Sequence, residues 1–176
     1  MAIRAFPPWF GWLLESRLRL RILPPATLIA RLPLAPDFVV CELGSGTGVY
    51  ARAVLPHVAQ LVGVELQSDF IRQARAKAPA LQQVQGSAQF LPLRPASLDL
   101  IYLVTVLGEV TDRVAALREI HGALRPGGFL AVAEHLPDPD YMSRTRLRSL
   151  CESAGFQFLK SEGEWWSYTS TFQRPR

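Results

Sequence analysis

A glycine-rich segment, Gly44-Ser45-Gly46-Thr47-Gly48, most constrains the fold of this 176-residue chain. An apolar run over residues 38–43 precedes it, and a helical pattern over residues 50–55 follows it. Glycines between a strand and a helix let the backbone turn tightly and approach a ligand closely, and open α/β sheets bind ligands at this edge. The segment therefore predicts a ligand site at the end of a first strand, with a purely structural turn as the alternative.

Short apolar runs alternate with helical patterns along the rest of the chain. Strands are expected at residues 38–43, 60–65, 81–84, 98–104, 129–133, 156–160 and 165–172. Helices are expected at residues 50–55, 113–124 (capped by Asp112), 144–154, and up to Ala78 from a cap at Ser68 or Asp69. Several runs are apolar on both faces, which is typical of a mostly parallel sheet between two helical layers. Residues 161–164 are too short a link for a parallel crossover, so the seventh and last strand should run antiparallel.

The N-terminal segment, residues 1–36, differs in charge from the rest of the chain. It carries five arginines against one glutamate, a balance of +4 that equals the net charge of the whole chain. Proline pairs enclose residues 9–23, which we predict to be helical although residues 17–22 alternate as a strand would; a short helix is expected at residues 26–31. A basic surface can meet a membrane, a nucleic acid or an acidic substrate, or can simply be solvated. We therefore separate residues 1–36 from a domain at residues 37–176.

Two cysteines, Cys41 and Cys151, are too isolated for a zinc site or a disulfide framework. We interpret both as buried thiols and predict no metal site. No apolar run is long enough to span a membrane, and no signal peptide is recognisable, so cytoplasmic residence is expected.

An acidic residue, Glu65, ends the second predicted strand 17 residues after Gly48. A carboxylate at this place can accept hydrogen bonds from both ribose hydroxyls of a nucleoside. The dinucleotide fingerprint requires G-x-G-x-x-G, whereas here Val49 stands where the third glycine would fall. No lysine is placed to hold a pyrophosphate, which disfavours a nucleoside triphosphate.

Over residues 38–172 the chain resembles the class I, Rossmann-like S-adenosylmethionine-dependent methyltransferases. The motif over residues 42–48 resembles the first motif of that family, and Glu65 its ribose-binding acid. Gly86-Ser87-Ala88 resembles the loop beside the adenine, although the family often has aspartate in place of Ser87. The resemblance implies a cofactor site for S-adenosylmethionine made of Glu42, Gly44, Ser45, Gly46, Thr47, Gly48, Glu65, Leu66, Ser87, Ala88, Gln89, Leu103 and Val104.

Methyl transfer from a sulfonium is an in-line displacement, so the protein needs a general base only where the acceptor carries a proton. By the resemblance, the acceptor should lie over the ends of the fourth and fifth strands. Glu109 and His135 are candidate bases there, and Tyr141 is a candidate for closing the acceptor pocket. Each of the three has a structural role as its alternative, and histidines that the family's small-molecule enzymes often carry are absent at residues 108–109.

The acceptor class is predicted by what the chain lacks. The fourth strand ends in Val104-Thr105-Val106-Leu107 rather than Asn-Pro-Pro-Tyr, and no RNA-binding motif is present, so nucleic acid is an improbable substrate. We predict a small-molecule or lipid-like acceptor, with residues 1–36 as a lid, as a peripheral membrane contact, or simply packed on the flank of the sheet. The alternatives are methylation of RNA or protein, or a catalytically silent cofactor-binding subunit. The sequence makes no prediction of the oligomeric state.

Overall fold

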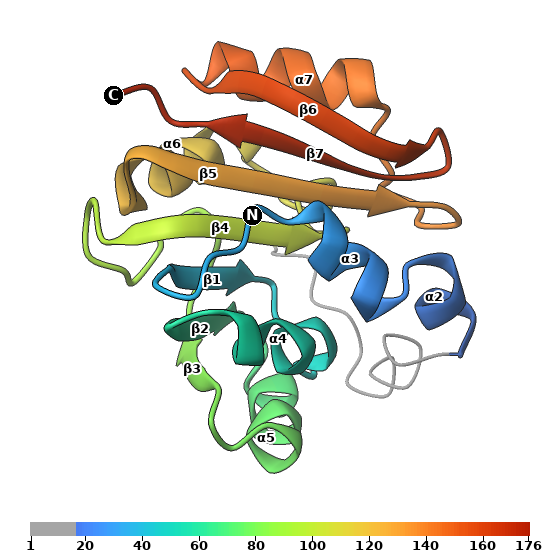
Figure 1. Cartoon of the computed structure of the whole chain (residues 1–176), viewed down its shortest axis with the longest axis vertical. Coiled ribbons are helices and arrows are strands. Elements are labelled where there is room, and N and C mark those ends of the chain that lie inside the picture. The colour runs from blue at the N-terminus through green and yellow to red at the C-terminus, as the bar shows by residue number, and fades with distance from the viewer. Residues whose placement is uncertain (1–16) are drawn as a thin grey trace.

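The computed structural model describes residues 17–176 and is built around one seven-stranded sheet (Figure 1). The strand order is β3-β2-β1-β4-β5-β7-β6. The five strands β1 to β5 are mutually parallel, and β7 runs antiparallel to both β5 and β6. The strands are β1 (Val39–Leu43), β2 (Gln60–Glu65), β3 (Gln82–Gln85), β4 (Leu98–Val104), β5 (Leu124–His135), β6 (Gln157–Glu164) and β7 (Ser167–Gln173). The predicted Rossmann-like, mostly parallel sheet with an antiparallel last strand is confirmed.

Helices cover both faces of the sheet and give three layers (Figure 1). They are α2 (Arg17–Ile22), α3 (Pro25–Arg31), α4 (Val49–Val54), α5 (Ser68–Lys77), α6 (Arg113–Ala123) and α7 (Arg144–Ser153), with a 3-10 turn at Leu55–His57. Leu117 of α6 and Leu147 of α7 are buried in one core, whereas Leu28 of α3 and Ala51 of α4 are buried in the core on the opposite face. This division follows from the strands, whose successive side chains point to opposite faces.

The strand order reverses beside β1, which pairs with β2 on one side and with β4 on the other. In sheets of this kind, ligands bind outside the carboxyl ends of the strands at such a switch point. The turn that contains the glycines, residues 44–48, lies at this point. The glycine turn, which was predicted to bind a ligand, therefore lies at the carboxyl ends of the strands, where a ligand site is expected.

Several boundaries differ from those predicted, most of them by one or two residues. The fifth strand begins at Leu124 instead of residue 129, because Leu98 pairs with Leu124 before the register shifts across the Pro-Gly-Gly bend. The turn between the last two strands is formed by Trp165 and Trp166, not by residues 161–164. Helix α5 begins at Ser68 and has no side-chain cap, so neither Ser68 nor Asp69 is its N-cap.

Residues 17–22 are helical, as favoured over a strand, while residues 9–16 of the predicted helix lie outside the described part of the chain. The junction after α2 is held from two sides. The Tyr50 hydroxyl donates to the Leu23 carbonyl at 3.0 Å, and the Ser167 hydroxyl donates to the Ile22 carbonyl at 3.4 Å. None of the described helices is long and apolar enough to cross a membrane.

We predict that Asp112→Ala lowers the free energy of unfolding by about 1 kcal/mol, because Asp112 Oδ1 accepts a hydrogen bond from the Ala115 amide at 2.9 Å and so caps α6. Asp112→Asn keeps an acceptor at this position and should retain most of the stability. Urea unfolding of the two variants checks the assignment, and equal losses would show that the carboxylate does not act as a cap.

Candidate active site

The glycine turn is held by main-chain hydrogen bonds and by three left-handed residues. Gly44, Gly46 and Gly48 have φ values of 76°, 51° and 80°. The Gly44 amide donates to the Val64 carbonyl at 2.8 Å, which ties the turn to β2. A β-carbon at Gly44 would lie only 2.4 Å from Val106 Cγ2, so the loop after β4 packs directly on this backbone. Glycine is therefore required here both by conformation and by space.

Glu65 connects the end of β2 to the glycine turn. The Gly46 amide donates to Glu65 Oε2 at 2.8 Å, and the Gln67 amide donates to Glu65 Oε1 at 2.9 Å. Each carboxylate oxygen has two acceptor lone pairs, so each can still accept one further hydrogen bond. The carboxylate is thus oriented with one acceptor position left on each oxygen, as two neighbouring ribose hydroxyls require.

A cavity of about 470 Å³ lies at this edge of the sheet, within the size range of small-molecule sites. Eleven of the predicted cofactor residues line it: Glu42, Gly44, Ser45, Gly46, Thr47, Glu65, Leu66, Ser87, Ala88, Gln89 and Val104. Two do not. Leu103 points to the opposite face of β4 and is fully buried, and Gly48 caps α4 with its backbone.

The far ends of the cavity differ in character. The Ser87 hydroxyl accepts a hydrogen bond from the Gln89 amide at 3.2 Å within its own loop and keeps its proton to donate. Glu42, 2% exposed, lines the other end. Burial, and next the charge of Glu42, raise the pKa of the Tyr102 phenol, which keeps this hydroxyl neutral beside the carboxylate.

Two of the three candidate catalytic residues line the cavity. Glu109 follows β4 and His135 ends β5, so the parallel strands bring both to the same edge. Tyr141 is not among the lining residues, and its hydroxyl donates to the Trp165 carbonyl instead. Its role in closing the pocket therefore remains a prediction without support from this geometry.

Sequence reasoning missed several lining residues: Ile22, Gln67, Phe70, Val110, Thr111, Pro137, Asp138 and Pro139. Residues 137–139 come directly after β5, and the rule that ligands lie at the carboxyl ends of parallel strands could have found them. Ile22 comes from a segment about 20 residues before the glycine turn, and no local pattern marks it as part of the site.

Glu134 lies next to His135 but on the opposite face of β5, where it is 1% exposed. Burial raises its pKa from 4.5 to about 8, and the Met142 amide donates to Oε2 at 3.4 Å. Glu134 is therefore mostly protonated at neutral pH and adds little negative charge behind the cavity. Burial also raises the pKa of the Cys41 and Cys151 thiols, so neither cysteine is suited to nucleophilic chemistry.

The turn and Glu65 fit a nucleoside cofactor, because both line the cavity and each Glu65 oxygen keeps one acceptor position for a ribose hydroxyl. The fold and this site define the chain as an α/β protein that binds a nucleoside cofactor at the first strand turn. The sequence model of a family described as "Methyltransferase domain" matches residues 41–132, which is more than half of the chain. The chain belongs to this family, the class I S-adenosylmethionine-dependent methyltransferases, and its cofactor is S-adenosylmethionine.

Relatives and solved structures agree with this assignment. The chain is 34% identical to the O-methyltransferase resE of Aspergillus sclerotiorum, over 74% of this chain and 59% of that protein. It is 33% identical to a trans-aconitate 2-methyltransferase of Methylobacterium radiotolerans, over 67% of this chain and 45% of that protein. A SAM-dependent methyltransferase from Aquifex aeolicus shares the fold with a TM-score of 0.87 at 16% identity, covering 97% of this chain and 100% of that one. The chain thus spans 59% or less of the length of these two curated relatives.

We predict that Gly44→Ala destabilises the protein by a few kcal/mol, because a left-handed alanine costs about 1–2 kcal/mol and its β-carbon meets Val106. Val106→Ala combined with Gly44→Ala removes the contacting methyl groups. It should recover the stability lost to the steric clash, but not the stability lost to the left-handed backbone conformation. A double-mutant cycle of urea unfolding measures this coupling. Strict additivity would contradict a direct contact.

Glu134 should make stability depend on pH. Between pH 4.5 and about 8 the native carboxyl holds a proton that the unfolded one has lost, so the free energy of unfolding falls as the pH rises through this window. Glu134→Gln removes this contribution to the slope. Between about pH 4 and about pH 9, the free energy of unfolding of the variant should therefore rise by up to about 5 kcal/mol relative to that of the parent.

The measurement is urea unfolding of the two proteins across this pH range. Glu152→Gln, which changes an exposed carboxylate on α7, is the matched control and should leave the slope as it is. Parallel curves for the parent and Glu134→Gln would contradict the raised pKa.

Proposed function

We propose that this chain transfers the methyl group of S-adenosylmethionine to a small-molecule or lipid-like acceptor by in-line displacement. One observation carries the proposal: the glycine turn and Glu65 line the same cavity as Glu109, His135 and the loops after β4 and β5. Cofactor and acceptor can therefore share one cavity, which in-line transfer requires.

Glu65 holds the cofactor by its ribose, through the lone pairs that Gly46 and Gln67 leave unused. Glu42, at the opposite end of the turn, is placed to accept from the amino group of the methionine part. When bound, the cofactor supplies the activated methyl group, so the chain has no covalent step to perform. Its residues position the two reactants and exclude water.

The acceptor end combines apolar residues with polar ones, since Thr105, Glu109, Thr111, His135 and Asp138 also belong to the lining. Ile22, Val106 and Val110 line it from α2 and from the loop after β4, and Pro137 and Pro139 line it from the loop after β5. Such walls bind apolar rings or chains by removing their surface from water. A flat apolar or lipid-like acceptor suits this lining better than a charged polymer does.

A proton acceptor is needed if the acceptor is a hydroxyl or an ammonium group. Glu109 and His135 are the cavity-lining candidates. His135 is 4% exposed, so an imidazole there is shielded from bulk water. We assign one of these two residues as the base and give Tyr141 no part in the chemistry, since it does not line the cavity.

The relatives support the small-molecule class. One is named an O-methyltransferase and another a trans-aconitate 2-methyltransferase. We also propose that residues 1–36 close the cavity as a lid over the domain at residues 37–176. The support is that Ile22 lines the cavity and that the Tyr50 hydroxyl holds the segment beside it.

The decisive measurement is calorimetry with S-adenosylmethionine and with NAD. S-adenosylmethionine should bind, and Glu65→Ala should weaken its binding at least about tenfold through the loss of charged hydrogen bonds. Glu152→Ala serves as a control and should bind as the parent does. Binding of NAD in place of S-adenosylmethionine would overturn the proposal.

Transfer of a labelled methyl group, tested on separate lipid, small-molecule, RNA and protein fractions, identifies the acceptor class. We expect label in the first two fractions. Glu109→Gln or His135→Asn should lower kcat about 100-fold with the affinity for S-adenosylmethionine unchanged. Label only in RNA or protein would support a macromolecular acceptor, and cofactor binding without any transfer would support a silent subunit.

A further inference from the structure

The turn between β6 and β7 exposes two adjacent tryptophans. Trp165 is 70% exposed and Trp166 is 38% exposed. The alternating pattern placed both in a strand, but β6 ends at Glu164 and β7 begins at Ser167, so the pair forms the tip of the hairpin. Among the described residues, no other two consecutive large apolar side chains are exposed. Large exposed aromatic side chains at a turn mark a surface that meets something apolar.

This turn is attached to the mouth of the cavity at two points. The Leu136 amide donates to the Trp166 carbonyl at 2.8 Å, and Leu136 lies between His135 and Pro137, which line the cavity. The Ser167 hydroxyl donates to the carbonyl of Ile22, another lining residue. The tryptophan turn is therefore tied to segments that line the cavity.

Arginines from three separate elements surround the turn. Arg21 is exposed and precedes Ile22. The Arg31 guanidinium of α3 lies against Gly163 and is half-buried. Arg144 of α7 is also half-buried, donates to the Gly163 carbonyl and lies over the Tyr168 ring, so Arg21 is the exposed arginine of the three.

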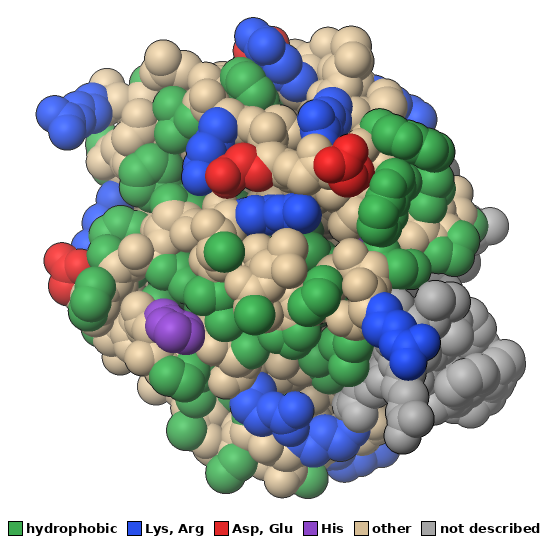
Figure 2. Space-filling view, turned by 45° about the vertical axis from the view of Figure 1, so that its right-hand side comes forward, with side chains coloured by type: hydrophobic (Ala, Val, Ile, Leu, Met, Phe, Trp, Pro, Cys, Tyr) green, Lys and Arg blue, Asp and Glu red, His purple; other side chains and the backbone are tan. Residues whose placement is uncertain are grey.

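The acidic side chains of the hairpin offset these charges only in part. Glu162 is paired with Lys160 at 2.6 Å, which leaves Glu164 as the acidic residue of the turn. Figure 2 looks toward this end of the sheet and shows hydrophobic side chains gathered beside Lys, Arg and acidic side chains.

We propose that the Trp165–Trp166 turn, with the exposed Arg21 beside it, docks this side of the cavity on an anionic lipid surface. Indole rings favour the headgroup level of a bilayer, and arginines around them attract anionic lipids. A two-residue hairpin tip is too small for a stable protein interface but can insert between headgroups. The inference rests on the proposed lipid-like acceptor, which would then enter the cavity without crossing water.

The experiment is co-sedimentation of the full chain with phosphatidylcholine vesicles, with and without roughly 30 mol% phosphatidylserine. We expect binding to the anionic vesicles that weakens with salt. Trp165→Ser combined with Trp166→Ser should weaken it about tenfold or more. Arg21→Glu should weaken binding to anionic vesicles and leave neutral vesicles unaffected.

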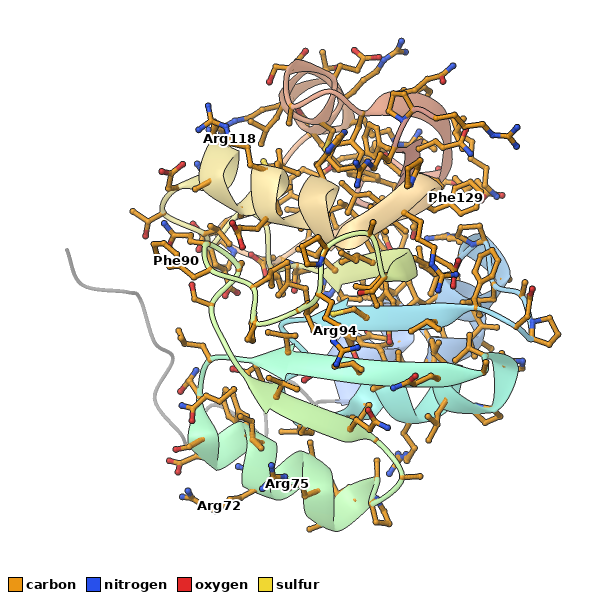
Figure 3. All side chains as sticks on the ribbon, turned by 90° about the vertical axis from the view of Figure 1, so that its left-hand side faces the viewer. Arg72, Arg75, Phe90, Arg94, Arg118 and Phe129 are labelled. Atoms are coloured by element: carbon orange, nitrogen blue, oxygen red, sulfur yellow. The ribbon has the colours of Figure 1, made fainter. Side chains whose placement is uncertain are left out.

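Phe90→Ser is the matched control. Phe90 is 79% exposed and lies in the connection from β3 to β4, on the side of the molecule that carries Arg94 and Arg118 (Figure 3). Its removal should not change vesicle binding. Calorimetry with S-adenosylmethionine shows that each variant is folded and separates this inference from the proposed function, since cofactor binding can persist when vesicle binding is lost. No vesicle binding, or equal binding by the parent and the tryptophan variant, would overturn the proposal.

Discussion

Two hydrogen bonds to the carboxylate of Glu65 hold the cofactor end of this molecule together. One comes from Gly46 in the turn after β1, and the other from Gln67 at the start of the next helix. They fix the ends of two neighbouring strands against each other and orient the carboxylate at the same time. The same carboxylate that stabilises the turn keeps one acceptor position on each oxygen, so its orientation is fixed by the protein itself.

The parallel half of the fold could be predicted from the sequence because local pattern and burial agree there. The bounds of β2 and β4 are those expected, since both are apolar runs with turn residues on either side. Eleven of the predicted cofactor residues line the cavity for the same reason, as a strand followed by a glycine turn has few other structural meanings. Leu103 was misplaced only because neighbouring residues of a strand face opposite ways.

The antiparallel half was harder to predict. Alternation from Trp165 onward suggested a strand from that residue, and nothing local shows that the chain reverses between β6 and β7 at the two tryptophans. The bend at residues 126–128 hid the true start of β5, because proline and glycine usually end an element whereas here the register shifts across them. The acceptor end depends on contacts distant in sequence, such as Ile22 with Ser167, which no periodicity reveals.

The position of β7 between β5 and β6 has a consequence for the order in which the molecule can be assembled. The glycine turn, Glu65 and the parallel strands β1 to β4 are all contained in residues 39–104. The rim of the cavity instead needs β5 and the final hairpin, because Leu136 and Ile22 are both held by residues 166–167. During synthesis the cofactor end therefore has all its strands well before the acceptor end does. A chain that ends before β7 would keep the residues of the glycine turn and lose the contacts that hold Ile22 and Leu136 beside the cavity.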